Sequence, residues 1–144
     1  MYPPELVKPM KEELTRIGVT ELLTGDDVRK ALDANRGTAL LVINSVCGCA
    51  AGNARPAVAM ALRNRHLPDH LYTVFAGQDG EATDAARSYI HGYPPSSPAI
   101  ALFRDTDLVL MLERKDIEGR MAPDVAHDLV TAFDAHCASG LPRP

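Results

Sequence analysis

The sequence predicts a three-layer α/β sandwich in which helices cover both faces of a central mixed β-sheet. Segments with helical periodicity alternate with short apolar segments along the chain, which is the order found in folds with parallel central strands. The segment 38–45 is apolar on both of its faces, as expected of a central strand with a helix layer on each side. A tight turn at 105–107 joins two further apolar segments, and so short a turn indicates an antiparallel hairpin.

The N-terminal half is expected to contain three helices and two strands. Apolar residues at spacings of three and four predict the first helix and its inner face, which would consist of Leu6, Met10, Leu14 and Ile17. Thr24 and the acidic residues after it have the pattern of a helix cap and predict the start of the second helix. Pro56 lacks a backbone donor and should bend or delay the third helix. The expected ranges are 3–17 (helix), 19–23 (strand), 24–35 (helix), 38–45 (strand) and 50–66 (helix).

The C-terminal half begins with one more strand and helix and ends in the hairpin and a last helix. The prolines of 92–98 make the strongest break in the chain, and Pro123 fits the first position of the last helix. The expected ranges are 71–76 (strand), 80–91 (helix), 99–103 (strand), 108–112 (strand) and 123–137 (helix). Without a linker or an internal repeat, 1–144 is expected to form a single domain.

The composition excludes several function classes. Of the 144 residues, 46% are hydrophobic and 24% charged, which is ordinary for a globular protein, and the net charge of −4 argues against nucleic acid as a partner. No stretch approaches the roughly 20 apolar residues of a membrane helix. Residues 1–5 lack both a basic leader and an apolar run, so we expect a cytoplasmic protein with no membrane partner. A homodimer is left open.

The most informative motif is Cys47-Gly48-Cys49, where the central strand meets the third helix. Open α/β sheets place their sites beyond the carboxyl ends of strands, and a helix N-terminus stabilises a nearby thiolate, the nucleophilic form of cysteine. Gly48 should supply the backbone freedom that the turn needs. We therefore predict thiol or redox chemistry at Cys47, with Cys47 the exposed nucleophile and Cys49 the more protected thiol.

A second motif, Ser97-Pro98, comes directly before the strand 99–103. The order of elements is that of a thioredoxin-like domain with an extra N-terminal helix. In such domains a cis-proline precedes the third core strand and faces the active-site sulfur, while the residue before it presents backbone groups to the substrate. We therefore expect a cis bond at Pro98.

The segment 44–56 resembles the active-site segment of the bacilliredoxin family, and so do Tyr2-Pro3-Pro4-Glu5 and 93–98, so the resemblance covers nearly the whole chain. It implies a thioredoxin-like thiol-disulfide oxidoreductase with no bound cofactor. Its co-substrate would be bacillithiol, a low-molecular-weight thiol, and its partners S-bacillithiolated proteins. Weak disulfide isomerase activity is implied as well.

The resemblance also implies roles for individual residues. Cys47 would attack the protein-side sulfur of a mixed disulfide, free the target thiol and carry bacillithiol, and Cys49 or a second bacillithiol would resolve the product. Gly48, Ser97 and Pro98 are expected to contact the substrate. Arg55 would add positive potential near Cys47 or bind a carboxylate of the anionic thiol, unless it is a solvated helix residue.

Two readings from other classes remain open at this stage. The cysteine pair would suit a soft metal ion such as Zn²⁺ or Cu⁺, with Cys137 and His136 as further candidate ligands, although their spacing is not that of a known metal motif. The other alternative is an interaction domain without catalytic activity. Asn44 and Ser45 are expected to stabilise the turn before Cys47, with hydrogen bonding to the substrate as the alternative.

Overall fold

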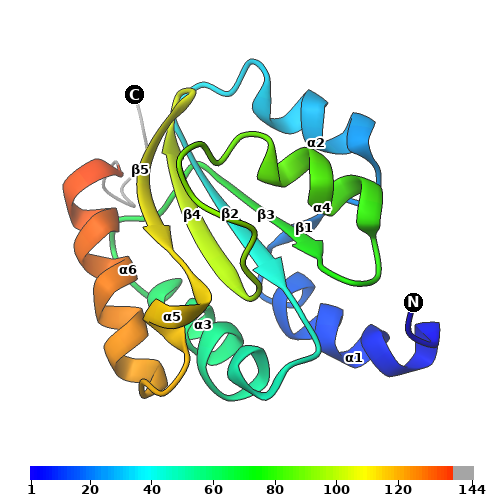
Figure 1. Cartoon of the computed structure of the whole chain (residues 1–144). Helices are drawn as coiled ribbons and strands as arrows, with labels where there is room; N and C mark the ends of the chain where they lie inside the picture. The colour runs from blue at the N-terminus through cyan, green and yellow to red at the C-terminus, as the bar shows by residue number, and fades with distance from the viewer. Residues whose placement is uncertain (138–144) are drawn as a thin grey trace.

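The computed structural model describes residues 1–137, so residues 138–144 of the predicted domain lie outside the described part. Five strands form one mixed sheet in the spatial order β1-β3-β2-β4-β5 (Figure 1). The strand ranges are β1 Thr20–Glu21, β2 Thr38–Asn44, β3 His70–Phe75, β4 Ala99–Arg104 and β5 Asp107–Leu112. This is the predicted α/β architecture, and the hairpin of β4 and β5 is antiparallel as expected.

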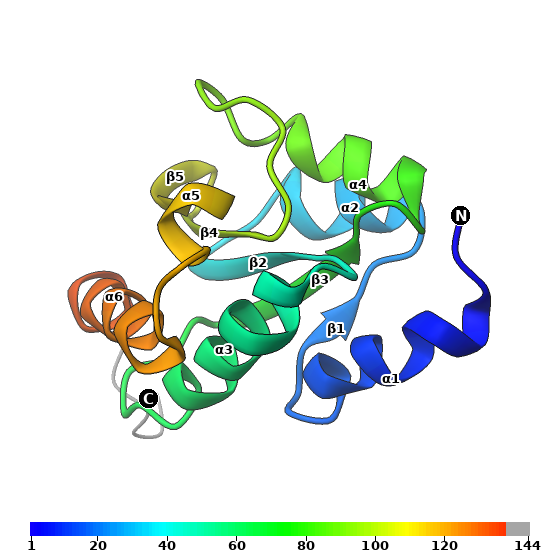
Figure 2. The ribbon, with the colours of Figure 1, turned by 60° about the horizontal axis from the view of Figure 1, so that its bottom comes forward.

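The helices lie on both faces of the sheet. α2 and α4 cover one face, and α1, α3 and α6 cover the other, which Figure 2 shows with the sheet seen nearly edge-on. The helix ranges are α1 Pro4–Thr15, α2 Gly25–Leu32, the π-helix η1 Ala50–Ala54, α3 Arg55–Ala61, α4 Gly80–Arg87, α5 Arg114–Ile117 and α6 Ala122–His136. The three layers are therefore helix, sheet and helix.

The pairing of the strands decides which chain segments meet at one edge of the sheet. β2 runs parallel to β3, with Asn44 opposite Phe75, and antiparallel to β4, with Ile43 opposite Ala99. β5 runs antiparallel to β4 and therefore parallel to β2. The carboxyl ends of β2, β3 and β5 consequently lie beside the start of β4, and the segments attached to them converge at that edge.

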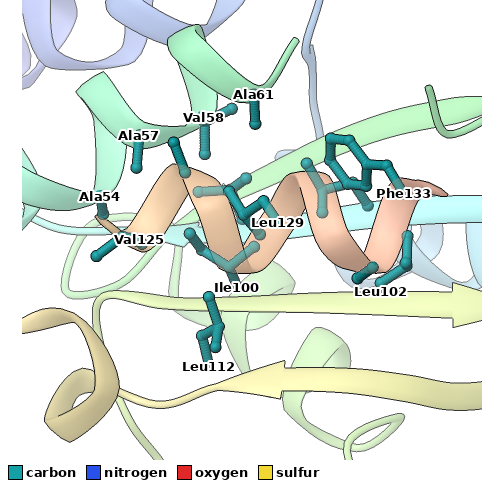
Figure 3. Packing of buried hydrophobic residues seen from close by; sticks show 14 of the residues in the cluster. Ala54, Ala57, Val58, Ala61, Ile100, Leu102, Leu112, Val125, Leu129 and Phe133 are labelled. Atoms are coloured by element: carbon teal, nitrogen blue, oxygen red, sulfur yellow. The ribbon is translucent and has the colours of Figure 1, made fainter. Parts of the chain in front are cut away.

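The core is divided by the sheet into two apolar clusters. Leu40 and Val42 of β2 pack in the cluster that includes α3 and α6, and Leu41 and Ile43 pack with α2 and α4. Figure 3 shows the first cluster, where the labelled side chains come from η1, α3, β4, β5 and α6. Burial of a large apolar side chain contributes about 1.5–3 kcal/mol, so a strand buried on both faces holds the site segment firmly.

The first helix differs from its prediction in part, whereas the cap of the second agrees with it. The inner face of α1 consists of Val7 and Leu14, whereas Leu6 and Ile17 are exposed. The reason is that α1 lies at the border of the fold, so that only a narrow stripe of it is covered. The cap of α2 is confirmed, since the Thr24 hydroxyl accepts a hydrogen bond from the Asp27 N–H at 3.0 Å.

The helices end earlier than the sequence pattern predicts. α2, α3 and α4 end at Leu32, Ala61 and Arg87, and the short helix α5 was not expected at all. Pro56 has the predicted effect: the α-helical part starts at Arg55, after five residues of π-helix. A proline has no N–H with which to continue the regular hydrogen-bond ladder, and π-helical turns are frequent at functional sites.

Candidate active site

The cysteine pair lies where the chain leaves β2 and enters the helical segment. The carbonyl of Cys47 accepts hydrogen bonds from the backbone N–H groups of Ala50 at 3.0 Å and Ala51 at 3.2 Å, so Cys47 lies at the start of this segment. Cys47 and Cys49 are joined in a disulfide, with 5.4 Å between their Cα atoms, and both are half-buried. The arrangement suits a thiol pair that alternates between reduced and oxidised forms.

Asn44 and Ser45 hold the turn before Cys47. The Asn44 Oδ1 atom accepts a hydrogen bond from the Ser45 N–H at 2.9 Å, and the Cys47 N–H donates to the Ser45 hydroxyl at 3.3 Å. The Asn44 amide also donates to the Met10 carbonyl of α1 at 3.2 Å. The predicted turn-stabilising role of both residues is confirmed, and the turn is connected to α1.

Arg55 lies elsewhere than predicted. Its side chain is 2% exposed, and its Nη1 atom donates to Asn44 Oδ1 at 2.9 Å and to the Ser45 carbonyl at 3.0 Å. Its Nε atom lies 3.2 Å from Glu13 Oε2 of α1 in an ion pair. A guanidinium so enclosed is not a solvated helix residue, and it is not open to a substrate carboxylate. Instead it fixes the backbone from which the Cys47 turn starts.

The peptide bond between Ser97 and Pro98 is cis, as predicted. Pro98 is buried at the start of β4, and Ser97 is half-buried. Because β4 runs antiparallel to β2, this bond lies at the edge of the sheet where the Cys47 turn begins. Ser97 and Cys47 line the same hollow.

This hollow is open to solvent and has a volume of about 340 Å³. Cys47, Ser97, Tyr2, Arg87 and Arg114 contribute to its wall, together with residues of the turns that follow β2 and β3. Cys49 is not among the described residues that line it. Of the two cysteines, Cys47 is therefore the one that borders this hollow, and its role as the nucleophile stays a prediction.

Gly48 is exposed, and a Cβ atom placed there would meet no described atom within 4 Å apart from those of its two chain neighbours. Its φ angle lies outside the left-handed region, so the turn does not require glycine for the backbone reason that we expected. The described residues beyond its two neighbours therefore set no steric requirement for glycine here, and the expected contact of Gly48 with the substrate stays a prediction.

The chain matches the family model described as Disulphide isomerase over residues 2–137. A bacilliredoxin of Salinibacter ruber is 59% identical over 143 residues, covering 98% of this chain and 84% of the relative. A bacilliredoxin of Koribacter versatilis is 51% identical, with 96% of each chain covered. The chain belongs to the bacilliredoxin family. A bacilliredoxin of Geobacillus kaustophilus is 49% identical over 94% of each chain.

Among solved structures, thioredoxins have the same fold as this bacilliredoxin. Fasciola hepatica thioredoxin aligns with a TM-score of 0.53 at 16% identity, covering 82% of this chain and 99% of the thioredoxin. Chlamydomonas reinhardtii thioredoxin f2 aligns with a TM-score of 0.54 at 12% identity, covering 82% and 95%. The thioredoxin-like fold is thereby confirmed, and the family membership makes this chain a thioredoxin-like disulfide oxidoreductase.

Three residues of the hollow were missed by reasoning from the bacilliredoxin sequence. Tyr2 belongs to the N-terminal motif, and its N–H donates to the Gln78 side chain at 2.8 Å, close to the turn after β3. Arg87 and Arg114 end α4 and begin α5. Neither arginine is part of a sequence motif, and only the topology of the sheet brings the two together.

The described residues contain no group of three or more His, Cys, Asp or Glu side chains placed to hold a metal ion. Cys137, one of the candidate ligands, is buried in the hydrophobic cluster at the end of α6. In residues 1–137, every helix is too short or too polar to cross a lipid bilayer.

Proposed function

We propose that this bacilliredoxin removes bacillithiol from mixed disulfides with protein cysteines in the cytoplasm, and that weak disulfide isomerase activity accompanies this reaction. The observation that carries the proposal is the Cys-Gly-Cys pair with Cys47 lining an open hollow beside Ser97. The hollow exposes the nucleophilic position to a disulfide from outside, and the chain belongs to a family of disulfide oxidoreductases.

In the first step the Cys47 thiolate attacks the bacillithiol sulfur of the mixed disulfide. A bond forms between Cys47 and bacillithiol, the original S–S bond breaks, and the target cysteine leaves as a thiolate that takes up a proton. Attack at the protein-side sulfur, the expectation from the sequence, would instead join Cys47 to the target and release bacillithiol. For Cys47 to carry bacillithiol, its thiolate must therefore attack the bacillithiol sulfur and not the protein-side sulfur.

In the second step Cys49 resolves this intermediate. Its thiolate attacks the Cys47 sulfur, bacillithiol leaves as a thiolate, and the Cys47–Cys49 disulfide forms, which is the oxidised pair of the structure. Two external thiols, or one external dithiol, then reduce the pair to the dithiol and are themselves oxidised to a disulfide. Alternatively, a second bacillithiol attacks the carried bacillithiol and leaves as the bacillithiol disulfide, which regenerates the Cys47 thiol.

The test is transfer of bacillithiol from a small protein that carries it on one cysteine, followed by intact mass. Wild type should free the target thiol, and Cys47→Ser should abolish the transfer because it removes the attacking sulfur. Cys137→Ala is the matched control, since Cys137 lies in the hydrophobic core, and it should transfer bacillithiol like wild type. A Cys47→Ser variant as active as wild type would rule the proposal out.

A further inference from the structure

We propose that Arg87, assisted by Arg114, binds a carboxylate of the small thiol that Cys47 takes up. This inference rests on the proposed function and names the part of the site that recognises the thiol. Arg87 is the last residue of α4, Arg114 is the first residue of α5, and both line the hollow that contains Cys47. The ligand class is a low-molecular-weight thiol that carries a carboxylate.

The charge of the hollow is opposite to that of the whole chain. The protein has a formal net charge of −4, yet the wall of this hollow holds two arginines, and no aspartate or glutamate is among the described residues that line it. Cationic groups gathered in a concave surface attract anions. The hollow therefore favours an anionic ligand next to the reactive sulfur.

Arg87 has unused hydrogen-bonding capacity. Its Nε atom is buried and has no hydrogen-bond partner among the described residues. Its Nη2 atom donates only to the Ser96 carbonyl, at 3.4 Å, and the described residues form no ion pair with it. Buried polar groups are nearly always bonded, and the planar guanidinium matches a carboxylate. A carboxylate ligand would supply the hydrogen-bond acceptors that the described residues do not provide to the Arg87 guanidinium.

Arg114 is more fully engaged and therefore assists. Its Nε atom donates to Glu118 Oε2 at 2.8 Å, and its side chain is half-exposed. Its backbone N–H donates to the Ser96 hydroxyl at 2.7 Å. Ser96 thus bonds to both arginines and directly precedes the Ser97-Pro98 bond, which fixes both of them relative to that bond.

The surroundings of Arg87 decide where the carboxylate goes. On its other side Arg87 borders a second hollow of about 320 Å³, whose wall is mostly apolar and includes Ile90, Tyr93 and Met111. A charged group is poorly solvated against such a wall. The carboxylate therefore lies on the side of Cys47, where Ser97 and Arg114 contribute polar groups.

The first experiment compares two mixed disulfides of the same peptide, one with bacillithiol and one with uncharged 2-mercaptoethanol. Arg87→Gln should slow the transfer of bacillithiol about tenfold, the loss expected for one charge-assisted hydrogen bond, and the transfer of mercaptoethanol less than about twofold. Arg87→Lys should fall between wild type and Arg87→Gln, because it keeps the charge without the planar fork. Arg65→Gln is the matched control, an exposed arginine on the loop before the opposite end of β3, and it should change neither rate.

The second experiment does not depend on bacillithiol. The reduced enzyme is alkylated with iodoacetate, which carries a carboxylate, and with neutral iodoacetamide, and the rates at Cys47 are compared. Arg87→Gln should lower the ratio of the iodoacetate to the iodoacetamide rate about threefold relative to wild type, because it removes a cation from the hollow.

The outcomes separate the two proposals. If wild type does not transfer bacillithiol but the alkylation ratio falls in Arg87→Gln, the proposed function fails and the carboxylate site stands. If wild type transfers both thiols and Arg87→Gln slows both equally, or if the alkylation ratio does not change, the inference about Arg87 is overturned while the proposed function stands.

Discussion

Arg55 and Arg87 differ sharply in their surroundings, although both lie beside the segment that carries Cys47. Arg55 is buried behind the turn, where Glu13, Asn44 and the Ser45 carbonyl occupy its guanidinium. Arg87 lines the hollow in front of Cys47, and its Nε atom has no hydrogen-bond partner among the described residues. The Arg55 Nε atom also lacks a hydrogen-bond partner among the described residues, but it is paired with the Glu13 carboxylate, whereas the described residues form no ion pair with Arg87. A guanidinium that already faces a carboxylate of the fold can only position the backbone, whereas one that faces none is free to receive a carboxylate from a ligand.

The largest expected effect is a difference in the free energy of unfolding between a variant of Arg55 and a variant of Arg87. Arg55→Met should lower the free energy of unfolding by about 2 kcal/mol, because it removes two charge-assisted hydrogen bonds to the turn. Arg87→Gln should change it by less than about 0.5 kcal/mol, as is usual for a residue outside such a network. Urea unfolding followed by circular dichroism measures both. Equal losses in the two variants would break the comparison.

A smaller effect concerns α1. Glu13 of this helix forms an ion pair with Arg55, and Lys11 of the same helix forms ion pairs with two carboxylates of other segments. The Lys11 ammonium bonds to Asp79 at 2.8 Å and to Glu21 at 3.0 Å. Burial by itself lowers the pKa of Lys11, but the hydrogen bonds and charges of the two carboxylates outweigh burial and raise it above 10.5. The stabilisation by Lys11 is complete below the pKa that Lys11 has in the unfolded chain. It is lost as the pH rises through the higher pKa that Lys11 has in the folded protein.

Wild type should therefore be more stable than Lys11→Met by about 1 kcal/mol near neutral pH, and this difference should shrink above about pH 10.5. Thermal unfolding of both proteins from about pH 8 to about pH 11 measures the difference. Since Lys11 is not among the described residues that line the hollow, the bacillithiol transfer rate at neutral pH should stay within about twofold of wild type. A difference in stability that stays constant over the whole range would contradict the role given to Lys11.

The sequence predicted the reactive centre well because its signals are local. The junction at Cys47 and the turn residues Asn44 and Ser45 depend on a few neighbouring positions, whereas the cis bond at Pro98 followed from the order of elements, which is that of a thioredoxin-like domain. The fold class followed from periodicity, since β2 is apolar on both faces. The site as a whole was less predictable, because its wall is built from six separate segments of the chain.

The two arginines show where local reasoning ends. Arg55 follows Cys49 by only six residues, yet its burial depends on α1, which brings Glu13 next to it from far away in the sequence. Arg87 is the last residue of α4. Only the antiparallel course of β4 and the path of the loop before β4 bring this arginine to the hollow. Partners supplied by tertiary packing leave no local pattern.

The most direct test of the account is to trap the first intermediate in Cys49→Ala, which keeps the attacking sulfur and lacks the resolving one. After reaction with a target protein that carries bacillithiol, peptide mass mapping should find bacillithiol on Cys47 and a free thiol on the target. The target protein joined to Cys47, or bacillithiol transferred equally well to Cys49 in Cys47→Ala, would contradict it.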